Sequence, residues 1–390
     1  MKKEVLIVSH CPRRGGSIGL IGELLKELSC LERNQYSLSL FDIDYSGSYH
    51  NRSDYDVDHF YKLETNKIDT IIRHIPKIGP NYFKNKTVST FNSIISSKSY
   101  DAVVFFPVVY YADELIHIAH NNGAKVIFYP WGSEILRCSG KIKSRLMKAF
   151  SNVDYVVGAI NANTLRAAKE IYGVNNERIK EKKPFVSNIA MIDEIKGKYS
   201  RKQMSEILNI NDSKCNIVCS YNGYATHRHE FIIDAIAQNK ELLPIDYQLI
   251  FPMTYGSASG YIDAIASKCK EKGLNAVFLT NFMSVEQMAC LHFLTDLFIE
   301  IQPTDAGNGF IIEALYAQNE IITGSWLHYS QFEEFGIPYH LIDTIDELPN
   351  KLYEFFKGNL QKPLIPQQII DMYSVPSKED RCFFWERLFN

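Results

Sequence analysis

Two acidic residues and two glycines are closely spaced in the stretch QPTDAGNGFIIEAL at residues 302–315. Asp305 and Glu313 lie eight positions apart, with Gly307 and Gly309 between them. The preceding apolar run predicts a strand and FIIEAL predicts a helix, whose first amides favour an anion. Carboxylates there would accept hydrogen bonds from hydroxyl groups. The spacing predicts a ligand with phosphates and hydroxyls; a helix cap at Asp305 and a solvated acid at Glu313 are the alternative.

A second group of polar residues follows a strand-like run in IVCSYNGYATHRHEF. Arg228 lies there between His227 and His229. A guanidinium suits a two-pronged contact with phosphate, so we expect Arg228 to bind a phosphate group; a solvated loop arginine is the alternative. Zinc binding would need a further ligand at a suitable spacing, and the sequence offers none.

These residues must be positioned by the elements around them, which alternate along the chain. Apolar runs such as EVLIVSH, AKVIFYP, CNIVCSY and DLFIEIQ predict buried strands, and amphipathic segments between them predict helices. Alternating elements favour parallel sheets covered on both faces. The fold class we expect is α/β, with two Rossmann-like doubly wound domains facing a central cleft, because such sheets bind ligands at the carboxyl ends of their strands.

A polar, charged segment near residues 183–195 interrupts the pattern and predicts a linker between the domains. We expect one Rossmann-like domain over residues 1–185 and a second over residues 186–375. Residues 376–390 predict a C-terminal helix that packs back toward the first domain.

The formal net charge of −3 conceals an uneven distribution. Residues 1–185 carry 26 Lys/Arg against 19 Asp/Glu, a net charge of +7, whereas residues 186–390 carry 16 against 26, a net charge of −10. A basic half predicts an anionic partner, either a phospholipid surface or a phosphate-linked substrate. The helix KIKSRLMKAFSN at residues 141–152 is a candidate for an anionic membrane surface. Chance and attraction between domains, and packing of that helix on the sheet, are the alternatives.

The cysteines and the apolar runs bear on localisation. The eight cysteines include no C-x-x-C pair and no zinc-site spacing, which is typical of buried free thiols in a reducing compartment. The first apolar run is too short for a signal peptide, and no run reaches the ~18 residues of a membrane helix. We therefore expect a cytoplasmic protein, either free or peripheral on the inner face of the membrane, with no nucleic-acid partner.

The acidic stretch resembles the E-x7-E motif of retaining GT-B glycosyltransferases of the family four type, with Asp305 in place of the first Glu. Ile217–Ile236 resembles the first strand–loop–helix of their nucleotide domain, and Leu249–Ser257 resembles a stretch of bacterial surface-polysaccharide glycosyltransferases. Phe278–Met288 resembles the strand end that holds the base. The resemblance implies donor contacts from Arg228, His227, Thr254, Tyr255, Asn281, Phe282, Gly307, Asn308, Gly309 and Glu313.

The first domain carries weaker similarities. Gly15 and Gly16 resemble the glycine pair beside the transferred sugar and acceptor. FYPWGSEI resembles the H-G-S-D stretch of the family, with Trp131 for its His and Glu134 for its Asp. A Glu there would position an acceptor hydroxyl or act as a base. The catalytic candidates are Glu134, Asp305, Glu313 and His10.

The resemblance implies a hexosyltransferase-type enzyme, with an acceptor-binding domain over residues 1–185 and a nucleotide-sugar-binding domain over residues 186–375. It would move a sugar from a nucleotide-diphosphate sugar to a glycan or polyprenyl-linked acceptor in bacterial surface polysaccharide synthesis, with retention at the anomeric carbon. It implies no metal and no cofactor, because Arg228 and helix amides would neutralise the leaving diphosphate. The alternatives are a non-catalytic two-domain sugar- or nucleotide-binding protein and an α/β hydrolase that uses Ser17 of GGSIG. An oxidoreductase is disfavoured because GNGFII lacks the third glycine of the dinucleotide motif.

Overall fold

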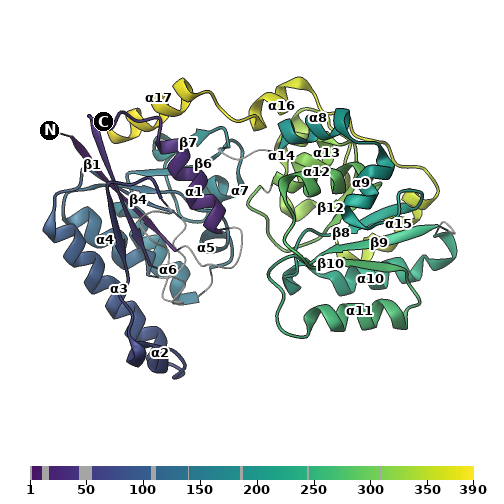
Figure 1. Ribbon diagram of the computed structural model, residues 1–390, viewed down its shortest axis with the longest axis horizontal. Coiled ribbons are helices and arrows are strands. Elements are labelled where there is room, and N and C mark those ends of the chain that lie inside the picture. The colour runs from purple at the N-terminus through teal and green to yellow at the C-terminus, as the bar shows by residue number, and fades with distance from the viewer. Residues whose placement is uncertain are drawn as a thin grey trace. The chain divides into compact units, whose positions relative to one another are not determined.

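The computed structural model describes residues 2–10, 17–43, 55–106, 111–138, 140–184, 188–243, 246–307 and 309–390 of the chain. The chain divides into two compact units (Figure 1). Unit 1 comprises Met1–Val186 and Val375–Asn390, and unit 2 comprises Ser187–Ser374. The boundaries expected from the sequence lie one residue away from these. Among the described residues, no helix is long and apolar enough to cross a membrane.

Unit 1 contains a parallel sheet with strand order β3-β2-β1-β4-β5-β6-β7. Its strands are β1 (Lys3–Ser9), β2 (Tyr36–Asp42), β3 (His59–Lys62), β4 (Ala102–Phe105), β5 (Lys125–Phe128), β6 (Tyr155–Ala159) and β7 (Ile179–Lys182). Its helices are α1 (Ser17–Leu28), α2 (Lys67–Arg73), α3 (Ile78–Ser97), α4 (Ala112–Asn121), α5 (Ser133–Leu136), α6 (Gly140–Ala149), α7 (Asn163–Glu170) and α17 (Lys378–Phe389).

The apolar run of β1 fills two cores because alternate side chains of a strand point to opposite faces. Leu6 and Val8 pack in a core with residues of α3 and α4. Val5 and Ile7 pack in a second core with residues of α1 and α17. Helices therefore cover both faces of the sheet, as the uninterrupted apolar run predicts.

Helix α17 completes the second of these cores. Trp385 is fully buried and its Nε1 donates a hydrogen bond to Oε1 of Glu27 at 3.0 Å. The same oxygen lies 2.5 Å from Nζ of Lys182. Burial lowers the pKa of Lys182, while the carboxylate of Glu27 acts to raise it. The C-terminal helix thus packs on unit 1 over a buried ion pair.

Unit 2 contains a parallel sheet with strand order β10-β9-β8-β11-β12-β13. Its strands are β8 (Cys215–Cys219), β9 (Tyr247–Pro252), β10 (Ala276–Leu279), β11 (Leu297–Glu300), β12 (Glu320–Gly324) and β13 (His340–Ile342). Its helices are α8 (Ile189–Lys198), α9 (Arg201–Leu208), α10 (His229–Gln238), α11 (Tyr261–Glu271), α12 (Val285–Leu294), α13 (Gly309–Tyr316), α14 (Ser330–Glu334), α15 (Leu348–Phe356) and α16 (Gln367–Tyr373).

The linker predicted near residues 183–195 is wrong in its extent. β7 ends at Lys182, and α8 already begins at Ile189. Charged residues hid this helix, but Ile189, Ile192 and Ile195 recur every three positions and are buried in the core of unit 2. The short strands β3, β7 and β13 were also missed, because their residues are partly exposed and form no apolar run.

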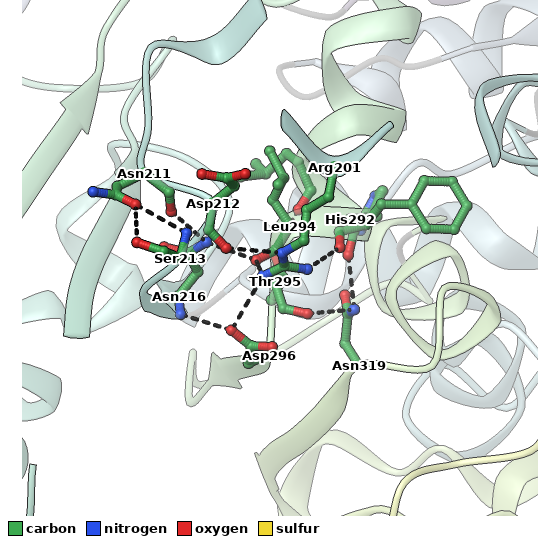
Figure 2. A network of polar contacts seen from close by, with 12 residues as sticks. Arg201, Asn211, Asp212, Ser213, Asn216, His292, Leu294, Thr295, Asp296 and Asn319 are labelled. Atoms are coloured by element: carbon green, nitrogen blue, oxygen red, sulfur yellow. Dashed lines mark hydrogen bonds and ion pairs between the residues drawn. The ribbon is translucent and has the colours of Figure 1, made fainter. Parts of the chain in front are cut away.

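Side-chain amides close the edge of the second sheet at which β8, β11 and β12 begin (Figure 2). Nδ2 of Asn319 donates to the carbonyl oxygens of His292 and Thr295 at 2.8 and 2.9 Å. Nδ2 of Asn216 donates to the carbonyl oxygen of Leu294 at 2.9 Å. Both asparagines are buried, so they satisfy carbonyls at the end of α12 that water does not reach.

Candidate functional site

The topology of unit 2 marks one place on its sheet for a ligand. β8 lies between β9 and β11, so the chain leaves β8 toward one side of the sheet and later returns to the other side. In doubly wound sheets, ligands bind at the carboxyl ends of the strands beside such a switch point. The loops that follow β8 and β11 meet there, and they carry Arg228 and Asp305.

Three loops are joined at this edge by hydrogen bonds. The amide N of Gly223, after β8, donates to the carbonyl of Tyr255, after β9, at 2.8 Å. Nη1 of Arg228 donates to the carbonyl of Ile301, after β11, at 3.2 Å. The expected basic and acidic residues therefore belong to neighbouring loops.

Arg228 has a constrained position in its loop. Its backbone is left-handed, with φ of 60°, and its side chain is half-buried. The guanidinium lies 5.8 Å from the ring centroid of Trp326. Nε1 of Trp326 in turn donates to the carbonyl of Gln302 at 2.8 Å. Burial lowers the pKa of Arg228 below its usual value. The arrangement presents an oriented cation beside the acidic loop, rather than a freely solvated arginine.

The carboxylate of Asp305 organises its own loop. It is 5% exposed. Oδ2 accepts from the amide of Gly307 at 2.9 Å and from the hydroxyl of Tyr329 at 3.0 Å, and Oδ1 accepts from Nε2 of Gln302 at 3.1 Å. Gly307 has φ of 100°, which favours glycine. These contacts favour a loop-holding role for Asp305, while its contact with a donor stays a prediction.

Glu313 lies beneath the same loop and is held from two sides. It is 7% exposed, so it is not the solvated acid of the alternative interpretation. Oε1 accepts from Nδ2 of Asn188 at 2.9 Å, and Oε2 lies 3.1 Å from Nε2 of buried His292. A Cβ on Gly309 would come within 3.3 Å of Oε1. A glycine at this helix start leaves the carboxylate room, which fits access to a ligand.

The two histidines beside Arg228 are core residues. His227 is buried, its Nδ1 contacts Oγ of Ser220, and its ring meets that of Tyr221 edge-on at 4.6 Å. His229 is fully buried, its Nδ1 lies 3.1 Å from the hydroxyl of Tyr261, and burial lowers its pKa to about 4. Among the described residues, no group of three or more His, Cys, Asp or Glu side chains could hold a metal.

The remaining donor candidates lie after β9 and β10. Thr254 and Tyr255 are half-buried, beside Gly256 with its φ of 86°. Asn281 and Phe282 are exposed and follow β10, the edge strand of the sheet, which β9 separates from β8. The structure thus brings Tyr255 next to the β8 loop, while Phe282 follows a strand that is not adjacent to β8. Asn308 lies outside the described residues.

In unit 1 the candidates follow β1 and β5, which also end at one edge. His10 is half-buried directly after β1. Trp131 is 40% exposed and meets Phe106 edge-on, with ring centroids 5.7 Å apart. Gly15 and Gly16 lie outside the described residues. The described part of this edge therefore offers an exposed tryptophan after β5 and a half-buried histidine after β1, with β4 between these two strands.

Glu134 has a different environment from the one expected. It is 2% exposed; Oε2 accepts from the amide of Gly132 at 2.9 Å, and Oε1 accepts from that of Trp131. Burial raises its pKa, and the amide hydrogen bonds oppose that rise. These contacts hold the turn that presents Trp131, and the role of Glu134 as a base stays a prediction.

Sequence reasoning missed several residues of the site in unit 2. Trp326 orients Arg228, Tyr329 holds Asp305, and His292 and Asn188 hold Glu313. The sequence gives no signal for Asn188, because it bonds a residue 125 positions away. Trp326 and Tyr329 lie in the polar aromatic run SWLHYS at residues 325–330, directly after a strand. This run was the sequence signal that could have identified them.

No protein-family model matches the chain, and no curated protein sequence matches it. Solved structures share its fold. A glycosyltransferase from Rickettsia africae ESF-5 has a TM-score of 0.63 at 12% identity, covering 100% of this chain and 94% of its own. The apo form of the lipopolysaccharide outer core galactosyltransferase WaaB has a TM-score of 0.65 at 13% identity, covering 99% and 98%. Anabaena HepE in complex with UDP has a TM-score of 0.58 at 14% identity, covering 100% and 96%.

These similarities extend over both units and show that the chain has the GT-B fold. The expected fold class of two Rossmann-like α/β domains is confirmed. The resemblance to GT-B glycosyltransferases is likewise confirmed as a likeness of fold.

Proposed function

We propose that this protein is a glycosyltransferase that uses a nucleotide-diphosphate sugar as donor. The observation that carries the proposal is the hydrogen bond of Arg228 to Ile301, directly before the loop that bears Asp305, at the switch point of unit 2 within a GT-B fold. The solved neighbours support it, since they include glycosyltransferases and a complex with UDP.

The donor would bind to unit 2. Arg228 would contact the diphosphate, and the first amides of α13 would contribute their partial positive charge. Together they would stabilise the negative charge that grows on the leaving group, which is the task a metal ion performs in other enzymes. Glu313 would accept hydrogen bonds from hydroxyl groups of the donor, with Asn188 and His292 keeping its carboxylate in place.

The acceptor would bind to unit 1, near His10 and Trp131, and Glu134 would fix the turn that carries Trp131. We propose a glycan or polyprenyl-linked acceptor of bacterial surface polysaccharide synthesis, and transfer with retention. Retention rests on the resemblance to the E-x7-E motif. The net positive charge of residues 1–185 supports an acceptor that carries phosphate.

The test is a thermal-shift screen of the full chain with UDP, GDP, dTDP and CMP. One nucleotide should raise the melting temperature, because a ligand at 100 times its dissociation constant adds about 2.7 kcal/mol of stability. If UDP, GDP or dTDP binds, a sugar conjugate of that nucleotide should then release the nucleoside diphosphate when acceptor lipid is added. Binding without release would favour a non-catalytic binding protein, and no binding at all would overturn the proposal.

A further inference from the structure

The connection between β3 and β4 carries a cluster of exposed isoleucines on α2 and at the start of α3. Ile68, Ile71, Ile75 and Ile78 are 64%, 67%, 39% and 58% exposed. Four of the 16 exposed large hydrophobic side chains of the described residues thus fall within eleven positions. Single exposed apolar residues are ordinary, but a contiguous group marks an interaction surface. We call these four residues the isoleucine patch.

The segment that bears the patch is firmly held. Asp69 is buried; its carboxylate accepts from Nζ of Lys86 at 2.6 Å, from the hydroxyl of Tyr82 at 2.7 Å, and from the amide of Asn66 at 2.6 Å. These bonds tie α2 to α3, which adjoin each other at the lower tip of unit 1 in Figure 1. The isoleucines are therefore exposed on the outer side of an ordered helical hairpin. On its inner side, the buried carboxylate of Asp69 already has its hydrogen-bond partners.

The charges around the patch are positive. Residues 62–86 contain six Lys/Arg and two Asp/Glu, a net charge of +4, and one of those acids is Asp69, already paired with Lys86. Lys67 directly precedes the patch and Lys77 lies between Ile75 and Ile78; both are exposed, and no carboxylate of the described residues forms an ion pair with either. The patch is thus apolar with a cationic rim.

This composition favours a lipid surface over a protein partner. Protein interfaces are depleted in lysine and enriched in aromatic residues and arginine, whereas the patch combines isoleucine with lysine. Aliphatic side chains that enter the acyl boundary, flanked by lysines at the level of anionic headgroups, are typical of interfacial helices. We propose that the isoleucine patch docks unit 1 on an anionic membrane surface.

The position of the patch also fits the proposed function. Of the arguments for membrane docking, only this one rests on the proposed function. β3 ends at Lys62 and α2 begins at Lys67, so the patch follows the carboxyl end of a strand. The strands of unit 1 are parallel, so His10 and Trp131 belong to the same edge of the sheet. A membrane-docked patch would bring that edge toward a lipid-linked acceptor.

The basic helix predicted from the sequence at residues 141–152 provides a matched control. In α6, Leu146 is buried, and Phe150 just after the helix is buried too. Nε of Arg145 donates to Oδ2 of Asp113 at 2.7 Å. Of the large apolar side chains of α6, only Ile142 and Met147 are exposed, at 49% and 46%. Its apolar side is largely used for packing in unit 1, so it offers less surface for lipid.

The experiment is co-sedimentation of the full chain with vesicles of phosphatidylcholine alone, or mixed with phosphatidylglycerol, at low and high salt. The wild type should bind the anionic vesicles, more weakly as salt rises. Ile68→Ser with Ile71→Ser should weaken binding about tenfold or more, because two large apolar side chains are lost from the lipid interface. Ile142→Ser with Met147→Ser should change it less than about twofold.

A further variant separates charge from apolar insertion. Lys67→Gln with Lys77→Gln should weaken anionic binding and reduce its dependence on salt. Circular dichroism and nucleotide thermal shifts should be unchanged in all three variants, because the substituted side chains are exposed and none belongs to the donor site. A failure here would thus leave the proposed function intact.

Three outcomes would overturn the docking proposal. The first is a wild type that binds no anionic vesicle at low salt. The second is loss of binding in the Ile142/Met147 variant but not in the Ile68/Ile71 variant. The third is an oligomer that the isoleucine substitutions convert to monomer, as seen by sedimentation equilibrium, while vesicle binding stays unchanged.

Discussion

The two edges of the second sheet use polar side chains in opposite ways. At the edge where the strands begin, Asn216, Asn319 and Arg201 donate to main-chain carbonyls (Figure 2). At the edge where they end, Asp305 and Glu313 accept chiefly from other side chains, among them Tyr329 and His292. The first arrangement closes the ends of secondary structure, whereas the second holds carboxylates in defined positions.

The edge where the strands begin also contains a hollow of about 440 Å³. Its lining balances Arg201, Lys214 and Lys362 against Asp212, Asp296 and Glu320. Such a surface has no net attraction for an ionic ligand. The size of a hollow is therefore a poorer guide to function here than the placement of buried carboxylates at the topological switch point.

The comparison predicts that the largest functional loss follows from a change at the edge where the strands end. Glu313→Gln should lower transfer about 100-fold, because a charged acceptor loses roughly 1.5–3 kcal/mol of hydrogen bonding in becoming a neutral amide. The near-isosteric side chain should leave the melting temperature within a few degrees. Release of nucleoside diphosphate from the donor identified by the screen gives the rate. Near-normal turnover would mean that Glu313 only supports packing.

Arg228→Ala should have a somewhat smaller effect, on binding. The nucleoside diphosphate should bind about 10- to 150-fold more weakly, and the bare nucleoside should bind almost as before. Arg228→Lys should recover part of the loss, since an ammonium cannot reproduce the planar contact or the stacking on Trp326. Calorimetric titration measures both ligands. Equal weakening of both would place Arg228 against the base instead of the diphosphate.

Asn319→Ala should affect stability instead of binding. Two buried carbonyls, of His292 and Thr295, lose the hydrogen bonds from Asn319, which costs about 1–3 kcal/mol of unfolding free energy. Urea unfolding measures this loss, and calorimetry should give an unchanged nucleotide affinity. If the affinity fell together with the stability, the two edges would not be functionally separate.

Gly309→Ala should have the smallest effect on turnover. It tests whether the position of the Glu313 carboxylate in the same helix, α13, matters for transfer. The added methyl would lie 3.3 Å from Oε1 of Glu313, so the carboxylate must shift slightly and turnover should fall a few-fold. Gly197→Ala in α8 is the matched control: nothing lies within 4 Å of its Cβ, so it should stabilise by about 0.5–1 kcal/mol without affecting turnover. Equal turnover in both variants would show that Glu313 tolerates displacement.

The sequence was most informative where contacts are local. Apolar runs predicted the central strands because both faces of those strands are buried. The acidic loop was placed between a strand and a helix correctly because β11, the loop and α13 follow one another between residues 297 and 316. Tertiary contacts were beyond reach: nothing in the chain indicates that Asn188 meets Glu313, or that the carboxylate of Glu134 is occupied by the amides of its own turn.

The return of the last helix to unit 1 has a consequence for protein synthesis. The ribosome makes all of unit 2 before it makes Trp385, which fills the core against Val5 and Ile7. Domains usually fold in the order of their synthesis, but here the later unit can fold first. During translation, α1 and the adjoining face of the first sheet stay uncovered until α17 is made. Over the same period, the ion pair of Glu27 and Lys182 lacks the hydrogen bond from the indole of Trp385. The nascent chain thus carries an open N-terminal core until α17 emerges.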